Sequence, residues 1–307
     1  MRAVVVDHWM EPSELAVREL PEPQAGPGML RVAVRAAGCN FFDILMVRGQ
    51  YQVRPPFPFV PGAELAGVVE EVGPGVDGFA PGDRVMASAG LGAFAERAAV
   101  PARSAYRLPE SMSFEAGAAF PIVYPTSYAA LVFRAPVKKG EWLLVHAAAG
   151  GVGIAAVQIG KALGARVIGT AGGADKLEVV RRVGADVAID YRGEDWVERV
   201  KEITDASLKC IAWNGQLLVI GFASGRIPEV KLNRVLLKNI SLVGLHWGAH
   251  VMHEPARIDE TFRALFDLYR TGAIEPVIYE RFPLEGLPAA LEALGSRRSY
   301  GKIVVTP

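Results

Sequence analysis

Residues 142–164, W-L-L-V-H-A-A-A-G-G-V-G-I-A-A-V-Q-I-G-K-A-L-G, restrict the possible folds of this chain more than any other stretch. The run at 142–146 is apolar and β-prone, and residues 147–153 have only small side chains, so the backbone there can approach another molecule closely. Apolar positions then follow helical spacing as far as Gly164, and a second apolar run occupies residues 166–169. The stretch therefore predicts one βαβ unit.

The turn in this unit is suited to binding a pyrophosphate. Free N–H groups and the positive end of the helix dipole meet at residues 150–153, so no cationic side chain is required. The match to G-x-G-x-x-G is partial, because Ala148 stands where the first glycine belongs. A glycine turn can also join a strand to a helix for packing alone. Its position between the two elements favours cofactor binding, and the expected contacts are Ala149, Gly150, Gly151 and Val152.

The rest of the chain predicts two domains. Short apolar runs punctuated by Gly and Pro occupy residues 1 to about 110, which is typical of a closed or partly open barrel of short strands. From residue 141 strands and helices alternate, the pattern of a parallel sheet covered on both faces. The pattern changes again after about residue 255, and we expect the last strands to return to the N-terminal domain. The predicted domains are 1–120 with 256–307, and 121–255.

The charge and cysteine content exclude several classes of partner and metal site. The chain has 33 Lys and Arg against 33 Asp and Glu, which provides no long-range attraction for nucleic acid or an acidic membrane, so neither partner is expected. The only cysteines, Cys39 and Cys210, exclude a disulfide framework and a four-cysteine metal site. Neither a signal peptide nor a membrane-spanning run is visible in the sequence. We therefore expect a cytoplasmic enzyme.

Motifs that run nearly from end to end give the chain a resemblance to a known family. They are A-A-G-C-N-F-F-D-I-L at 36–45, R-G-Q-Y at 48–51, P-F-V-P-G-A-E-L-A-G-V-V at 58–69, P-G-D-R-V at 81–85, H-A-A-A-G-G-V-G at 146–153, I-G-F-A at 220–223 and G-K-I-V-V at 301–305. The chain resembles the zinc-free, zeta-crystallin-like quinone oxidoreductases of the medium-chain dehydrogenase/reductase superfamily. The resemblance implies a doubly wound Rossmann domain, a GroES-like β-barrel catalytic domain and a homodimer, for which the strand at 241–245 offers an edge.

The positions of the zinc ligands explain why no metal is expected. Zinc-dependent relatives have a cysteine at the position of Asn40 and a histidine in G-H-E, where this chain has G-A-E with Ala63. His246, His250 and His253 cluster in the sequence and could share a helix face. Gly248 beside a tryptophan favours a loop with solvated histidines instead.

The end of the second strand of the βαβ unit predicts NADPH rather than NADH. NAD enzymes place an acid there for the ribose 2′-hydroxyl, whereas this chain has T-A-G-G at 170–173, with Gly172 in the turn. Lys176 follows within one helical turn, and Tyr191 follows the third strand. Both positions match the 2′-phosphate contacts of the resembled family. The alternative is a solvated lysine and a surface ring.

The resemblance also implies the residues beside the reacting atoms. Asn40 and Tyr51 would line the cleft beside the nicotinamide, with the Tyr51 hydroxyl donating a hydrogen bond to the acceptor oxygen. The alternative for Tyr51 is packing among Phe57 and Phe59, and for Asn40 it is hydrogen bonding to local backbone. Further cofactor contacts implied by the resemblance are Thr126, Phe222, Ser224, His246, Trp247 and Lys302.

One strand is missing from the doubly wound pattern. After the run at 187–189 an amphipathic helix carries Trp196, Val197, Val200 and Ile203 on one face, and a second helix is predicted at 207–212 without a strand between them. A doubly wound sheet has a central strand at this point of the chain. Relative to that pattern the chain is short by about 15 residues, which would form the strand and its connections. We infer either a true deletion or a segment absent near Thr204-Asp205.

Together these features predict an NADPH-dependent, zinc-free reductase of quinones or related α,β-unsaturated carbonyls. Aromatic and apolar residues in the motifs suit a flat, uncharged acceptor. One alternative is reduction of the double bond of an enone or alkenal by the same hydride donor. Another is a non-catalytic protein that only binds NADPH.

Overall fold

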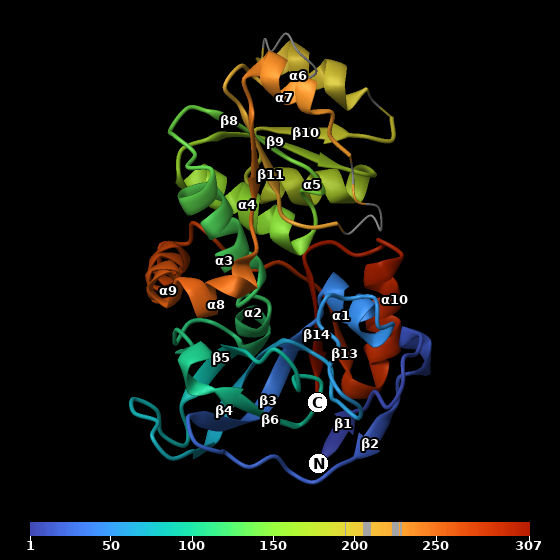
Figure 1. Ribbon diagram of the computed structural model, residues 1–307, viewed down its shortest axis with the longest axis vertical. Helices are drawn as coiled ribbons and strands as arrows, with labels where there is room; N and C mark the ends of the chain where they lie inside the picture. The colour runs from blue at the N-terminus through green and yellow to red at the C-terminus, as the bar shows by residue number, and fades with distance from the viewer. Residues whose placement is uncertain (194, 205–209, 223–226, 228) are drawn as a thin grey trace. The chain divides into compact units, whose positions relative to one another are not determined.

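The computed structural model describes residues 1–193, 195–204, 210–222, 227 and 229–307 and divides into two units (Figure 1). Unit 1 comprises Met1–Ile122 and Pro276–Pro307, and unit 2 comprises Val123–Glu275. The domain boundaries predicted from the sequence, and the catalytic and cofactor-binding roles predicted for the two domains, stay predictions.

Unit 1 is built on a seven-stranded sheet of order β13-β14-β3-β4-β5-β7, with β6 paired to β3. The strand pairing in this unit, all of whose residues are described, runs from β13 to β7 and does not close into a barrel. As expected, the last strand returns to the N-terminal sheet, because β14 pairs antiparallel with β3. The strands are β3 Met29–Gly38, β4 Glu64–Val72, β5 Arg84–Ser88, β6 Arg97–Pro101, β7 Ala105–Arg107, β13 Ile278–Pro283 and β14 Lys302–Thr306.

Alternating side chains of these strands form the core of unit 1. Leu30, Val32 and Val34 of β3 are buried at every second position, as a strand with one face on a core requires. The same cluster includes Leu65, Val85 and Val305, together with Leu287, Ala290 and Leu291 of α10. The helices of the unit are α1 Phe41–Val47, α2 Phe114–Ala118 and α10 Leu287–Gly295, with 3-10 turns η1 Pro12–Glu14, η2 Ala102–Ser104 and η5 Leu284–Gly286.

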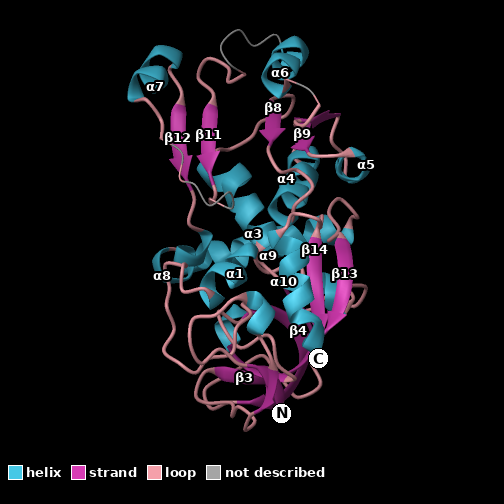
Figure 2. Cartoon of the chain, turned by 90° about the vertical axis from the view of Figure 1, so that its right-hand side faces the viewer, coloured by secondary structure: helices cyan, strands magenta, loops and turns pink. Residues whose placement is uncertain are grey.

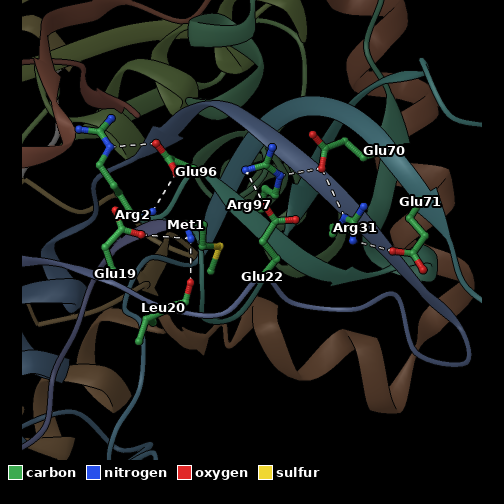
Figure 3. Close-up of polar contacts among 10 residues, drawn as sticks. All are labelled: Met1, Arg2, Glu19, Leu20, Glu22, Arg31, Glu70, Glu71, Glu96 and Arg97. Carbon is green, nitrogen blue, oxygen red and sulfur yellow. Dashed lines mark hydrogen bonds and ion pairs between the residues drawn. The ribbon is translucent and has the colours of Figure 1, made fainter.

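Ion pairs link the N-terminal strands of unit 1 across its sheet (Figure 3). Arg31 pairs with Glu70 at 3.4 Å and with Glu71 at 2.8 Å, and Arg97 pairs with the same Glu70 at 2.9 Å. Arg2 pairs with Glu96 at 2.9 Å, next to the hairpin of β1 (Arg2–Val4) and β2 (Val17–Glu19). These side chains are partly exposed, so each pair contributes little, and the shared carboxylate of Glu70 makes them a network.

Unit 2 contains the predicted βαβ unit. Strands β8 (Trp142–Val145), β9 (Arg166–Ala171) and β10 (Val187–Asp190) form a parallel sheet of order β10-β9-β8. Helix α4 (Gly151–Ala162) connects β8 to β9, and α5 (Ala174–Arg182) connects β9 to β10. The sequence prediction of a strand, a turn and a helix at residues 142–164 is confirmed.

Helices of unit 2 pack around the buried amide of Gln158 in α4. Its Oε1 accepts the Tyr124 hydroxyl of α3 at 2.8 Å and the Glu275 N–H at 3.1 Å, and its Nε2 donates to the Glu275 carbonyl at 2.9 Å. This one side chain therefore joins α3 and α4 to the chain that follows α9. The remaining helices are α3 Val123–Tyr128, the π-helix η3 Ala129–Arg134, α6 Trp196–Thr204, α7 Leu232–Lys238, η4 Trp247–Ala249, α8 His250–His253 and α9 Pro255–Arg270.

The parallel sheet of unit 2 is split where the sequence lacks a strand. Strand β11 (Gln216–Val219) pairs with β12 (Ser241–Gly244), and in the described residues neither pairs with β8. In Figure 2 the arrows of β12, β11, β8 and β9 point the same way. No strand is described between α6 and β11, so the expected gap is present. Of the helix predicted at 207–212, residues 207–209 lie outside the described residues and 210–212 are not helical.

Candidate functional site

The glycine turn of unit 2 brings the backbone to the start of helix α4. Ala147 has a positive φ of 51°, and the Gly150 N–H donates to the Ala147 carbonyl at 2.9 Å. A Cβ atom on Gly153 would lie 2.3 Å from that same carbonyl, so only glycine fits there. Because α4 begins at Gly151, the N–H groups of its first turn lack intrahelical acceptors. The turn fits a bound pyrophosphate group.

Two further glycines, which the sequence reasoning passed over, let helices approach the strands. A Cβ atom on Gly160 of α4 would lie 2.6 Å from Leu143 Cδ2 of β8. A Cβ atom on Gly169 of β9 would lie 2.5 Å from Val180 Cγ1 of α5. Close packing of helix on strand therefore holds the turn in place. In the sequence, these two positions could be recognised as glycines inside a helical or a strand pattern.

The carboxyl ends of β9 and β10 meet beside α5. A Cβ atom on Gly172 would lie 2.7 Å from the Tyr191 hydroxyl oxygen and 2.7 Å from Arg192 Nε. Asp190 accepts the Gly173 N–H at 3.2 Å and the Arg192 N–H at 2.9 Å. The structure thus brings the predicted Tyr191 and Gly172 together. It adds Arg192, which the sequence reasoning missed although it directly follows Tyr191.

The other predicted contacts in unit 2 lie on separate elements. Thr126 is half-buried in α3, and Phe222 is exposed after β11. Trp247 stacks on His250 with ring centroids 5.0 Å apart, and His246 is exposed beside it. Ser224 lies outside the described residues. The cofactor roles of all these residues stay predictions.

Unit 1 holds a buried polar cluster around Lys302, the first residue of β14. Lys302 Nζ lies 2.8 Å from Asn40 Oδ1 and 2.7 Å from Glu64 Oε1, and it donates to the Cys39 carbonyl at 2.6 Å. Asn40 Nδ2 donates to Glu64 Oε1 at 2.8 Å, and Glu64 Oε2 accepts the Ile122 N–H at 3.0 Å. Lys302, Asn40 and Glu64 are all buried. The amide of Asn40 is therefore oriented by a lysine and a carboxylate.

Asp43 adds a second buried carboxylate at the start of α1. Its Oδ2 accepts the Asn40 N–H at 2.7 Å, which caps the helix. Its Oδ1 has no hydrogen-bond partner among the described residues. Burial raises the pKa of Asp43 to about 7, while the Asn40 N–H and Lys302 act in the opposite direction. Burial also raises the pKa of the Cys39 thiol.

Tyr51 lies at the edge of the unit 1 core. Its ring stacks on Phe42 of α1, with centroids 5.4 Å apart and planes inclined by 27°. Phe57 and Phe59, the packing partners considered from the sequence, stack on one another at 5.9 Å. Partial burial, and then the charge of Asp43, raise the pKa of Tyr51, so its hydroxyl stays protonated at neutral pH.

The cluster around Asn40 does not fit a zinc ion. A buried ammonium lies 2.8 Å from the Asn40 amide oxygen and would repel a cation, and the Cys39 thiol resists ionisation. In the described ranges, no group of three or more His, Cys, Asp or Glu could hold a metal. None of the helices in the same part of the chain is long and apolar enough to cross a membrane.

Comparison with models of known protein families assigns the chain to a family of enzymes. The family model for the alcohol dehydrogenase GroES-like domain matches residues 26–110, and the model named zinc-binding dehydrogenase matches residues 151–268. The chain is an oxidoreductase that belongs to the medium-chain dehydrogenase/reductase family, in its quinone oxidoreductase branch. The predicted fold class, a GroES-like domain with a Rossmann domain, is confirmed except that unit 1 has no closed barrel.

Individual relatives agree with this placement. The quinone oxidoreductase-like protein 2 homolog of Nematostella vectensis is 40% identical over 91% of this chain and 82% of its own length. Quinone oxidoreductase-like protein 2 of Rattus norvegicus is 33% identical over 99% of this chain and 92% of its own. The Escherichia coli quinone oxidoreductase complexed with NADPH superposes with a TM-score of 0.92 at 32% identity, covering 100% of both chains.

Proposed function

We propose that the protein is an NADPH-dependent reductase that transfers hydride to quinones or related α,β-unsaturated carbonyls without zinc. The observation that carries the proposal is the glycine turn before α4, where Gly153 has no room for a Cβ atom and the first helical N–H groups are free of intrahelical acceptors. The quinone oxidoreductase relatives and the NADPH complex of the Escherichia coli protein support the choice of substrate class and cofactor.

The residues of unit 2 bind the cofactor in this proposal. Ala149, Gly150, Gly151 and Val152 hold the pyrophosphate through backbone N–H groups at the start of α4. Gly172, Lys176 and Tyr191 receive the adenosine 2′-phosphate, since the turn after β9 has no carboxylate of its own to repel it. The further contacts are those predicted from the resemblance: Thr126, Phe222, Ser224, His246 and Trp247.

The residues of unit 1 bind and orient the acceptor in this proposal. Bound NADPH supplies a hydride from C4 of its nicotinamide, and the reduced acceptor takes up one proton as NADP⁺ forms. The Tyr51 hydroxyl, protonated at neutral pH, donates a hydrogen bond to the acceptor oxygen. Asn40 is held by Lys302 and Glu64, which fixes the orientation of its amide.

The experiment follows absorbance of NADPH, with NADH in parallel, in the presence of an ortho-quinone or a simple enone. Quinone turnover with NADPH alone is the expected result. Turnover of the enone alone would favour double-bond reduction, and equal use of NADH would contradict the cofactor assignment. NADPH binding without turnover of either acceptor would favour a non-catalytic binding protein.

Tyr51→Phe tests the role of the hydroxyl in the same assay. Removing one hydrogen-bond donor to a developing oxyanion is expected to lower kcat by about tenfold to a thousandfold while leaving NADPH affinity unchanged. Tyr279→Phe is a suitable control, because Tyr279 packs edge-on against Tyr300 elsewhere in unit 1. An unchanged kcat in Tyr51→Phe would leave the ring with a packing role only.

We also propose a cytoplasmic homodimer. Strand β12 pairs with β11 on one side, and in the described residues its other edge has no strand partner. An apolar edge of this kind pairs readily with a second copy. Light scattering on the purified protein is expected to give about twice the mass of one chain, and a monomer would contradict this part of the proposal.

A further inference from the structure

The chain passes between the two units at two points, and one buried side chain of unit 2 holds the residues next to both. Unit 1 gives way to unit 2 between residues 122 and 123, and the chain returns to unit 1 between residues 275 and 276. Tyr124 lies just after the first connection, and Glu275 lies just before the second. Both are hydrogen-bonded to the amide of Gln158 in α4.

The amide of Gln158 has one orientation that satisfies these partners. Its Oε1 accepts the Tyr124 hydroxyl at 2.8 Å and the Glu275 N–H at 3.1 Å, and its Nε2 donates to the Glu275 carbonyl at 2.9 Å. Burial raises the pKa of Tyr124, so its hydroxyl stays a donor at neutral pH. Because the side chains of Gln158 and Tyr124 are buried, water does not compete for these hydrogen bonds.

On the side of unit 1, the same two connections are held by residues of the buried polar cluster. Glu64 Oε2 accepts the Ile122 N–H at 3.0 Å, and the Lys302 N–H donates to the Val277 carbonyl at 2.8 Å. In each connection, one residue separates the residue held in unit 1 from the residue held in unit 2. In the second connection that residue is Pro276, whose ring restricts φ. Each connection therefore has few free backbone torsions.

The helix that carries Gln158 also begins at the turn that binds the cofactor in the proposed function. Gln158 lies about two turns, or about 10 Å, along α4 from Gly151, so its side chain is remote from a pyrophosphate at that turn. Ser127 of α3 donates to the Val152 carbonyl at 2.9 Å, which holds α3 against the first turn of α4. One helix thus joins the glycine turn to both connections.

We propose that Gln158 is a positioning residue for hydride transfer, because it fixes both connections relative to the helix that holds the cofactor. This inference rests on the proposed function, in which unit 2 binds NADPH and Tyr51 of unit 1 binds the acceptor. Hydride transfer requires the donor and acceptor atoms to be in reacting geometry, and a displacement of about 1 Å costs about a hundredfold in rate. Loss of Gln158 therefore slows hydride transfer and leaves NADPH binding intact.

The test measures hydride transfer and cofactor binding separately in Gln158→Met, which keeps the length of the side chain and removes its hydrogen bonds. Stopped-flow absorbance of NADPH gives the rate with a saturating ortho-quinone or enone, whichever the wild-type protein reduces. Titration calorimetry without acceptor gives the Kd of NADPH. The rate is expected to fall by about tenfold to a hundredfold, while the Kd stays within about twofold of wild type.

Tyr124→Phe provides a milder second variant, which keeps the inference testable if Gln158→Met does not fold. It removes one of the three hydrogen bonds and leaves the Gln158 oxygen bonded to the Glu275 N–H. A smaller loss of rate is expected, again with an unchanged Kd of NADPH.

Ile159→Ala is the matched control. Ile159 is the fully buried neighbour of Gln158 in α4, so this variant weakens the packing of the same helix and keeps all three hydrogen bonds. At a temperature at which circular dichroism shows each variant to be folded, its rate and its Kd are expected to equal those of wild type.

The outcomes separate this inference from the proposed function. Wild-type protein that binds NADPH but reduces neither acceptor would overturn both. Wild-type turnover that Gln158→Met and Tyr124→Phe leave unchanged would overturn only the role of Gln158. Parallel losses of rate and NADPH affinity would also overturn it, because the residue would then shape the glycine turn. So would an equal loss of rate in Ile159→Ala, because any loosening of α4 would then be sufficient.

Discussion

At the scale of single residues, we expect loss of the Lys302 ammonium to lower the free energy of unfolding most. It is the cation bound to the buried carboxylate of Glu64, and it also holds the Asn40 amide oxygen. Lys302→Met leaves that carboxylate buried and unpaired, which is expected to lower the free energy of unfolding by about 3 to 5 kcal/mol. Denaturant unfolding followed by circular dichroism measures the change.

Lys161→Met provides the comparison for this prediction. Lys161 pairs with Asp186 at 2.7 Å, but both side chains are more than 30% exposed, at 34% and 39%. A partly exposed pair is worth less than about 1 kcal/mol. Equal destabilisation by the two variants would contradict the view that burial makes the Lys302 pair important.

The raised pKa of Asp43 predicts that the free energy of unfolding depends on pH. Burial raises its pKa to about 7 in the folded protein, above the value of about 3.9 expected for an unfolded chain. Between these values the folded state binds a proton that the unfolded state has released. This contribution to stability is complete below about pH 4 and is lost as the pH rises to about 7, at roughly 1.4 kcal/mol per pH unit.

Comparing wild type with Asp43→Asn isolates this effect. The asparagine can still accept the Asn40 N–H but does not titrate. Between pH 4 and pH 7, wild-type stability is therefore expected to fall relative to that of the variant, by a few kcal/mol in total. Asp7, Glu96 and Asp186, whose pKa values are lowered by arginine, lysine and backbone partners, cancel in the difference. Parallel stability curves would show that Asp43 ionises normally.

At the scale of elements, the split sheet predicts unequal stability within unit 2. Strands β11 and β12 pair with each other alone in the described residues, and α7 beside them exposes Leu232, Leu236 and Leu237 by 75%, 79% and 70%. An isolated pair of strands is marginally stable, whereas β9 is paired on both sides and packed under α4 and α5.

Hydrogen exchange followed by mass spectrometry tests this difference. Amides of β11 are expected to exchange at least about tenfold faster than those of β9, because fewer interactions oppose local opening. The long strand β3 of unit 1 provides a slowly exchanging reference within the same sample. Equal protection of β9 and β11 would indicate that the edge of β11 is covered in solution.

At the scale of the whole molecule, the mass of the protein decides between the two explanations of the missing strand. The 307 residues correspond to 32.9 kDa. A segment absent near Thr204-Asp205 predicts an intact mass higher by about 1.5 kDa, the weight of a strand and its connections. Intact-mass spectrometry of protein from its natural source measures this, and a value of 32.9 kDa would establish a true deletion.

The sequence by itself determined the features that depend on neighbouring residues. The turn at residues 147–153, the helix after it and, in the residues that the structure describes, the lack of a strand between α6 and β11 could be predicted, because side-chain size and apolar spacing act over a few residues. The family could be identified from its motifs for the same reason.

Only the tertiary structure decided which distant residues meet. Lys302 contacts Asn40 across 262 positions of the chain, and no local pattern records that a lysine would orient this amide. Arg192 reaches Gly172 because two parallel strands end at one edge of a sheet. The sequence also left open whether the barrel closes, since closure depends on how strand ends meet in space and not on the strands themselves, and the pairing in unit 1 does not close.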